Sequence, residues 1–313
     1  MTPDGSLFTF CPLQLIVTVE RHLCVTLSFR PQYKCRFLHH GDPYLKLGPF
    51  KEEKMISRPY VVIFHDILNN KEIDYLIEEA RPNLSRKRDF TKSNKVAYAR
   101  HELRGNKKRR IVQKTVQAWI EEAAWDQIVH VDKNFTMNTH HKGINHQVLW
   151  DLAAKIKLAT KLETQKHLSS TQMQVTNYGL GGLCEVHIDP HGYIEGAHTP
   201  MDREHLKVTG DMIGTFMAWL SDCEAGGGTA YAYPGREGVI LPERGAAAFW
   251  YDLNAKGHRD LVTRHGGCPV LKGSKWILNK WMYYFDNFKE FPCQLSENKP
   301  FDEPAKHDYF TNK

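Results

Sequence analysis

One histidine and one aspartate, two positions apart, form the first pair in this sequence that could bind a metal ion. His187 and Asp189 stand on either side of Ile188 in the run Val-His-Ile-Asp. In a β-strand, side chains two positions apart point to the same face of the sheet, so both groups would face one side. Cys184, Val186 and Ile188 are then expected to face the other side, toward a core. One imidazole and one carboxylate leave a metal short of one protein ligand.

A second histidine from a distant strand would complete a set of two histidines and one carboxylate. His265, in the run Thr-Arg-His-Gly-Gly-Cys-Pro-Val-Leu, is the candidate. Such a set occupies one face of a metal and leaves positions open, which is typical of non-haem Fe(II) oxygenases. The His-x-Asp pattern alone is weak evidence, because the sequence has 17 histidines. A surface or hydrogen-bonded core histidine would produce the same pattern.

Longer motifs around these residues favour the metal interpretation. They are, in order, Asn-Tyr-Gly-Leu-Gly-Gly-Leu-Cys-Glu-Val-His-Ile-Asp at 177–189, Trp-Leu-Ser-Asp-Cys-Glu-Ala-Gly-Gly-Gly-Thr at 219–229, Gly-Ala-Ala-Ala-Phe-Trp-Tyr at 245–251, and the segment 263–281. Together they closely resemble the catalytic domain of the collagen prolyl 4-hydroxylase α subunit, an Fe(II)/2-oxoglutarate dioxygenase. The resemblance runs from about residue 34 to residue 293.

The resemblance implies roles for individual residues. His187, Asp189 and His265 match the family's iron ligands. Lys275 matches the lysine that binds the distal carboxylate of 2-oxoglutarate by charge-assisted hydrogen bonding. Thr229 matches a hydroxyl near the same carboxylate.

Two more side chains belong to this comparison. Tyr178 matches an aromatic residue that lines the co-substrate pocket. Lys280 lies close in sequence to the co-substrate lysine, and we expect it to face solvent or to form a salt bridge.

The implied reaction is hydroxylation of peptidyl proline to 4-hydroxyproline in collagen-like sequences, with O₂ as oxidant and succinate and CO₂ as co-products. The family also needs L-ascorbate as a reductant. Cys184, Val186, Met212 and Phe216 replace the family's usual residues along the substrate groove. Two alternatives therefore stay open: the same oxygenase chemistry on a different Pro-rich protein, or a non-catalytic paralogue that retains the fold.

The compartment is inferred from the cysteines. The chain has seven, and the resemblance pairs Cys268 with Cys293 and Cys24 with Cys35. Bridged pairs would place the protein in an oxidising compartment, the lumen of the endoplasmic reticulum. Buried thiols in a cytosolic enzyme are the alternative. The apolar residues 7–19 make a poor signal peptide, because no Lys or Arg precedes them.

The net charge and the resemblance indicate which partners to expect. The net charge of +6 is modest, and the basic run 104–110 lacks aromatic neighbours, so we expect no nucleic-acid partner. No stretch predicts a membrane span. The family's α subunits pair with protein disulfide isomerase, so the resemblance implies this protein as a partner. It also implies a collagen-like or other Pro-rich peptide as the substrate.

Positioning these residues requires a sheet-rich fold. Residues 60–65 predict a strand, and a helix is expected to begin after Asn69 and to end at Pro82. Residues 148–159 predict an amphipathic helix. Short strands with Gly-rich turns follow from residue 172 to residue 285.

This pattern predicts an α+β protein with a double-stranded β-helix core, which is a cupin-like jelly roll, and flanking supporting helices. We expect an unassigned leader at 1–33, a catalytic domain at 34–293 and a C-terminal tail at 294–313. Residues 85–120 loosely match a family region whose loops cover the peptide groove, and about 121–145 is expected to form an inserted loop. The chain would then be a catalytic domain without the family's N-terminal domains, a truncated or mispredicted product.

Overall fold

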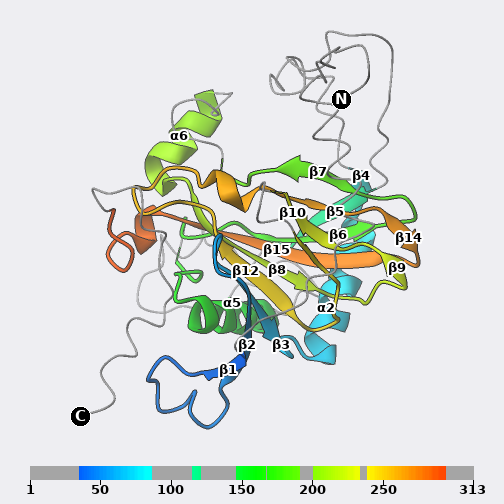
Figure 1. Cartoon of the computed structure of the whole chain (residues 1–313), viewed down its shortest axis with the longest axis horizontal. Coiled ribbons are helices and arrows are strands. Elements are labelled where there is room, and N and C mark those ends of the chain that lie inside the picture. Colours follow the sequence, from blue (N-terminus) through cyan, green and yellow to red (C-terminus); the bar gives the residue numbers. More distant parts are fainter. Residues whose placement is uncertain are drawn as a thin grey trace, which may run out of the picture.

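The structure is a computed structural model that describes residues 35–86, 115–120, 146–166, 168–190, 200–232 and 238–293. Figure 1 shows a large sheet with a smaller sheet over one face and helices α2 (Asn70–Ala80) and α5 (His146–Thr160) over the other. The expected leader at 1–33, the inserted loop at 121–145, the basic run at 104–110 and the tail at 294–313 lie outside the described residues. The domain boundaries stay predictions.

The large sheet contains nine strands. In spatial order they are β1 (Cys35–Leu38), β2 (Phe50–Ile56), β3 (Val61–His65), β12 (Ala247–Tyr251), β8 (Met212–Trp219), β15 (Lys275–Tyr283), β6 (Met173–Tyr178), β5 (Thr115–Ile120) and β4 (Ser85–Arg86). The small sheet contains β11 (Gly238–Ile240), β10 (Thr229–Tyr231), β13 (His265–Gly267) and β7 (Cys184–His187). A short ribbon pairs β14 (Val270–Lys272) with β9 (Ala225–Gly226).

The chain passes repeatedly between the two sheets from β6 onward. Strands β6, β8, β12 and β15 lie in the large sheet, while β7, β10, β11 and β13 lie in the small one, and neighbours pair antiparallel. This winding is the double-stranded β-helix predicted from the sequence. It brings His187 and His265, which are far apart in the sequence, onto adjacent strands.

The predicted helix after Asn69 is confirmed as α2 (Asn70–Ala80). The Asn69 side chain accepts from the backbone N–H of Glu72, and the Glu72 carboxylate accepts from the backbone N–H of Asn69. This capping box satisfies donors that the first helical turn leaves unpaired. The helix ends before a 3₁₀ turn, Arg81–Asn83, that contains Pro82.

The second predicted helix is α5 (His146–Thr160). Its buried side chains recur at helical spacing: Leu149, Leu152, Ala153, Ile156 and Ala159. They share one core with α2 and the large sheet. The third helix, α6 (Pro200–Thr209), follows β7 in the chain. Short 3₁₀ turns at Leu261–Thr263 and Phe285–Asn287 flank β13 and β15.

A second core occupies the space between the two sheets. It contains large aromatic side chains, among them Tyr178, Trp219, Tyr231 and Trp250. Because the smaller sheet and these rings cover the inner face of the large sheet, polar groups on that face are shielded from water. The site described below lies at this inner face.

The structure corrects the expectations for Lys280 and for residues 115–120. Lys280 is 0% exposed, and its Nζ donates to the backbone oxygen of Thr171 at 2.9 Å, so it does not face solvent. Its neighbours on the same face of β15, Leu278 and Met282, lie in the core shared with α2 and α5, which explains the burial. Residues 115–120, expected in a loop, form strand β5 and pair with β6.

The predicted disulfide pairs are also wrong. Cys35 and Cys293 carry free thiols, and the Cys293 Sγ lies 2.8 Å from the Tyr284 hydroxyl. Cys268 is disulfide-bonded, and Cys24 lies outside the described residues. A pairing taken over from related proteins therefore does not describe the cysteines of this chain.

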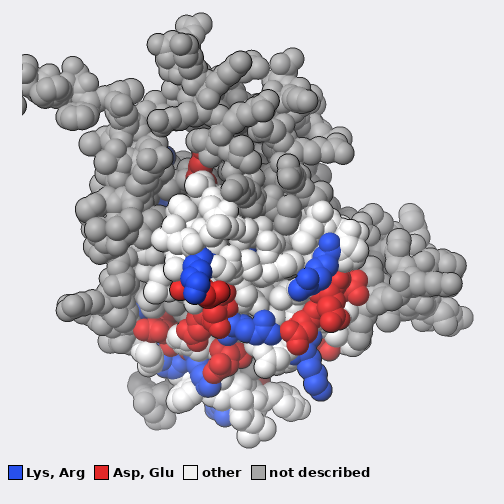
Figure 2. Space-filling view, turned by 90° about the vertical axis from the view of Figure 1, so that its right-hand side faces the viewer, with Lys and Arg blue, Asp and Glu red and all other residues white. Residues whose placement is uncertain are grey.

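Basic and acidic side chains alternate on the face shown in Figure 2. Ion pairs among the described residues include Arg244–Asp74 at 2.9 Å and Lys272–Glu224 at 2.6 Å. The described part of this face thus carries both signs of charge. Among the described residues, no helix is long and apolar enough to cross a membrane.

Candidate metal centre

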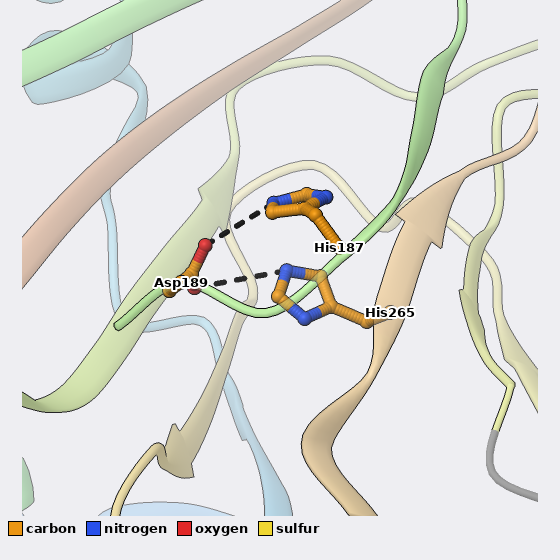
Figure 3. Close-up of side chains that lie close together, drawn as sticks. All are labelled: His187, Asp189 and His265. Atoms are coloured by element: carbon orange, nitrogen blue, oxygen red, sulfur yellow. Dashed lines mark ion pairs between the residues drawn. The ribbon is translucent and has the colours of Figure 1, made fainter. Parts of the chain in front are cut away.

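Three side chains converge where β7 ends beside β13. His187 is the last residue of β7 and pairs directly with His265, the first residue of β13. Asp189 Oδ1 lies 3.2 Å from His187 Nε2, and Asp189 Oδ2 lies 3.7 Å from His265 Nε2. Figure 3 shows the carboxylate facing both rings. One ligand atom from each residue lies within 4.8 Å of the others, a spacing that fits a single metal ion.

Two glycines allow the strands to approach. A Cβ on Gly266 would lie 3.0 Å from the backbone oxygen of Cys184 and 3.0 Å from Val186 Cγ2. The register of β13 against β7 shifts between His265 and Gly267, a local irregularity that re-aims side chains. Cys184 is affected: its Sγ lies 3.8 Å from His187 Nδ1, so the expectation that it faces away from the site is wrong.

Backbone carbonyls hold Nδ1 of both imidazoles, the ring nitrogen that does not face Asp189. His187 Nδ1 lies 2.8 Å from the oxygen of Glu185, and His265 Nδ1 lies 2.9 Å from the oxygen of Thr263. Because a carbonyl only accepts, each Nδ1 donates to it, and Nε2 of each ring is left facing Asp189. This is the arrangement that orients histidine toward a metal.

The charges at the site also suit metal binding. Burial lowers the pKa of His265 to about 4, so its imidazole is neutral near pH 7. Burial alone would raise the pKa of the Asp189 carboxyl, but His265, His187 and the Thr215 hydroxyl outweigh it and hold that pKa below its usual range. The side chains of Asp189 and His265 are 5% and 8% exposed, whereas that of His187 is 41% exposed. The centre is therefore open on the side of His187.

Lys275 is a buried cation on the same inner surface. It is 2% exposed, its Nζ lies 3.4 Å from Thr229 Oγ1, and it lies 5.6 Å above the ring of Tyr178. No carboxylate of the described residues lies within ion-pair distance of it. Burial lowers the pKa of Lys275 to about 8, so the amine is still mainly protonated near pH 7.

A buried ammonium without a carboxylate is costly unless an anion pairs with it. The structure thus brings together the three residues predicted to bind the co-substrate, Lys275, Thr229 and Tyr178. Lys275 and Tyr178 are cross-strand partners in β15 and β6.

Two further polar residues were missed from the sequence. Thr215 and Asp252 are buried, at 2% and 0% exposure, and Thr215 contacts Asp189. Their only sequence signal is a polar residue within, or directly after, an otherwise apolar strand. That signal does not distinguish a contact to the site from a hydrogen bond elsewhere in the core.

Comparison with known proteins defines the class of domain. Residues 173–283 match the family model described as the 2OG-Fe(II) oxygenase superfamily. The chain therefore contains a 2OG-Fe(II) oxygenase domain, a class that implies Fe(II) and 2-oxoglutarate.

The particular relatives within that class are prolyl 4-hydroxylase alpha subunits. The chain is 33% identical over 267 residues to mouse prolyl 4-hydroxylase subunit alpha-1, covering 84% of this chain and 42% of the mouse protein. It is 30% identical over 280 residues to human subunit alpha-3, covering 88% of this chain and 44% of the human protein. The chain thus spans less than half the length of these relatives.

Among solved structures, the viral collagen prolyl hydroxylase of Paramecium Bursaria Chlorella virus-1 aligns with a TM-score of 0.42 and 20% identity, over 71% of this chain and 94% of that one. A prolyl-4-hydroxylase of Pseudomonas putida aligns with a TM-score of 0.38 and 13% identity, over 71% of this chain and 91% of that one.

Proposed function

We propose that this chain hydroxylates peptidyl proline to 4-hydroxyproline in collagen-like sequences, using Fe(II), 2-oxoglutarate and O₂. One observation carries the proposal: the His187–Asp189–His265 cluster and the unpaired ammonium of Lys275 line one interior. The similarity to prolyl 4-hydroxylase alpha subunits selects proline as the target. In this reaction one oxygen atom of O₂ enters the proline, and the other enters succinate as 2-oxoglutarate loses CO₂.

His187, Asp189 and His265 would hold Fe(II). Two imidazoles and one carboxylate are borderline and hard donors that suit this ion. Bound iron would supply the activation of O₂ that oxidises an unactivated C–H bond. The three protein donors come from one end of β7 and β13, and a set of two histidines and one carboxylate would leave coordination positions open for the co-substrate and O₂.

Lys275 would bind the distal carboxylate of 2-oxoglutarate. Its ammonium donates a charge-assisted hydrogen bond, and Thr229 adds a hydroxyl donor to the same group. The ring of Tyr178 lies beside this ammonium. Because Lys275 is buried next to the inter-sheet core, the ion pair would form with little competition from water.

The remaining parts of the proposal follow the family. L-ascorbate would restore iron that is oxidised in turnovers without product. The endoplasmic reticulum lumen is the proposed location, and protein disulfide isomerase a proposed partner. A different Pro-rich protein substrate is the second candidate, favoured by Cys184, Met212 and Phe216 replacing the family's residues. A non-catalytic paralogue is the third.

Succinate formation from 2-oxoglutarate tests these candidates. The full chain is incubated with Fe(II), 2-oxoglutarate and ascorbate, with and without a (Pro-Pro-Gly) repeat peptide. Peptide-dependent succinate together with hydroxyproline, detected by mass spectrometry, supports the proposal. Slow succinate that the peptide does not accelerate supports a different substrate. No succinate under any of these conditions supports the paralogue.

A further inference from the structure

The Thr215 hydroxyl lies between two carboxylates in the interior of the barrel. Its Oγ1 is 2.7 Å from Asp189 Oδ2 and 2.7 Å from Asp252 Oδ2. Thr215 is 2% exposed and Asp252 is 0% exposed. Three oxygens therefore form a short chain that begins at a buried acid and ends at a proposed metal ligand.

The number of available protons determines the direction of these two hydrogen bonds. A threonine hydroxyl has one proton and can donate it to only one of the two carboxylates. The second 2.7 Å contact needs a proton from a carboxyl group. Asp189 must be an anion to bind a metal ion, so the proton belongs to Asp252.

The surroundings of Asp252 suit a neutral acid. No cation of the described residues lies within ion-pair distance of it, and its second oxygen, Oδ1, makes no well-formed hydrogen bond. A buried carboxylate with so little compensation would be very costly. Burial, followed by the charge of Asp189, raises the pKa of Asp252 well above its usual value.

We propose that neutral Asp252 donates to Thr215, whose hydroxyl donates to Asp189 Oδ2, and that this relay fixes the metal-binding orientation of Asp189. Oδ2 is thereby engaged, and Oδ1, 3.2 Å from His187 Nε2, is the oxygen presented to the metal. Asp252 and Thr215 are positioning residues. The inference rests on the proposed metal centre.

The backbone holds the relay in place. Thr215 and Trp250 are cross-strand partners in β8 and β12. The ladder continues past β12, because the backbone N–H of Asp252 donates to the oxygen of Ile213 at 2.9 Å. Thr215 lies in β8 and Asp252 directly follows β12, and the hydrogen bonds between these two strands fix the distance between the two residues.

Metal binding tests the relay without any need for turnover. Co(II) affinity of the full chain, cleared of metal with a chelator, is measured by titration calorimetry, and the absorption spectrum of bound Co(II) reports its coordination. Loss of a group that orients a metal ligand commonly costs about 10- to 100-fold in affinity. We expect a loss of that size, with an altered spectrum, for Thr215→Val, which is nearly isosteric, and for Asp252→Ala.

Conservative variants separate the relay from simple damage to the core. Thr215→Ser keeps the hydroxyl, and Asp252→Asn keeps a neutral donor, so both should bind Co(II) within about threefold of wild type. If Asp252 acted as an anion, Asp252→Asn would lose affinity as Asp252→Ala does. The double variant Thr215→Val/Asp252→Ala should be no worse than either single change, because both interrupt one chain.

Two kinds of failure are distinguishable. Three results would each overturn the relay but leave the metal centre in place. The first is wild-type Co(II) affinity and spectrum in Thr215→Val, and the second is an equal loss of Co(II) affinity in Asp252→Asn and Asp252→Ala. The third is a loss in the double variant that equals the sum of the two single losses. Absence of Co(II) binding in wild type, or undiminished binding in His265→Ala, would overturn the metal centre and the relay with it. Asp252→Asn preserves shape, so the test still stands if Asp252→Ala does not fold.

Discussion

Lys275 and Tyr178 face each other across the β15–β6 ladder, and the Lys275 ammonium lies 5.6 Å above the Tyr178 ring. Both residues belong to the site proposed for 2-oxoglutarate. The ring excludes water from one side of the ammonium but contributes no negative charge. An anion is still needed to pair with Lys275, and the first prediction follows from that need.

Lys275→Ala should raise the KM for 2-oxoglutarate by about 30-fold to several thousand-fold. Truncating one partner of a buried, hydrogen-bonded charge pair costs roughly 2–5 kcal/mol. Co(II) affinity should stay near the wild-type value, because Lys275 does not contact the metal ligands. Lys275→Arg keeps the charge in a bulkier shape, so a partial loss is expected. Steady-state kinetics at varied 2-oxoglutarate provide the measurement.

The matched control for this experiment is Lys272→Ala. Lys272 is 73% exposed and pairs with Glu224 at the surface, so its loss should leave the KM unchanged. Lys280, close in sequence to Lys275, is unsuitable because it is buried and holds the backbone of Thr171. A KM within about twofold of wild type in Lys275→Ala would end the co-substrate assignment.

The pH dependence of co-substrate use should report the same amine. Burial lowers the pKa of Lys275 to about 8 in the free protein. Below that pH the lysine is charged and binds the carboxylate; above it the charge is lost. The kcat/KM for 2-oxoglutarate should therefore fall as pH rises through about 8, by up to about tenfold per pH unit. Lys275→Arg, which stays charged, should lack this decline, and an identical decline in that variant would contradict the assignment.

His187→Ala, Asp189→Ala and His265→Ala should each abolish succinate formation while the protein stays folded. Each change removes one of three donors, and two are too few to hold the ion in an open site. Activity, Co(II) affinity and the unfolding midpoint are measured on the same samples. His258→Ala, outside the cluster, is the control. Near-wild-type turnover in any of the three variants would be incompatible with the proposed metal centre.

The residues of the site could be predicted from the sequence because their spacing follows strand geometry and long motifs surround them. His187, Asp189 and His265 meet as expected, and Lys275 joins Thr229 and Tyr178. The capping residues before α2 and the apolar spacing of α5 are local signals, so those helices were predictable too.

The failed predictions depend on tertiary neighbours. Lys280 was expected at the surface because its side chain is charged, but it shares its face of β15 with Leu278 and Met282, which pack into the core with α2 and α5. Cys184 has the strand parity of a core residue, and the register shift between β7 and β13 brings its sulfur to His187. The relay through Thr215 and Asp252 depends on the pairing of β8 with β12, which no local pattern reveals.

His65 should make the stability of the fold depend on pH. Its two ring nitrogens lie 3.0 Å from Glu243 and 2.9 Å from Glu53. Burial lowers the pKa of His65, but the hydrogen bonds and charges of the two glutamates outweigh it and raise the pKa above 6.5. The charged form thus stabilises the fold fully below pH 6.5, and this contribution disappears as pH rises through the elevated folded-state value.

His65→Gln tests this contribution. Because the site is partly exposed, the variant should lose only about 0.5–1 kcal/mol of unfolding free energy near about pH 5.5 and almost nothing near about pH 9. Urea denaturation at both pH values measures the difference. Glu243→Gln should show about half the effect. Equal losses for His65→Gln at the two pH values would mean that packing, rather than charge, accounts for them.

The last prediction concerns the close approach of β7 and β13. A Cβ at position 266 would lie 3.0 Å from the backbone oxygen of Cys184, which cannot move without shifting β7. Gly266→Ala should therefore displace His187 relative to His265 and weaken Co(II) binding by about tenfold or more, the size expected when ligands are misplaced.

Gly267→Ala is the matched comparison for that change. Its Cβ would meet the Cys184 Cβ at 3.3 Å, a looser contact with a side-chain atom, and its position lies further from the ligands. Gly267→Ala should therefore weaken Co(II) binding less than Gly266→Ala, while both variants unfold near the wild-type temperature. If Gly266→Ala bound Co(II) as tightly as wild type, the spacing of these two strands would not be what sets the distance between the histidines.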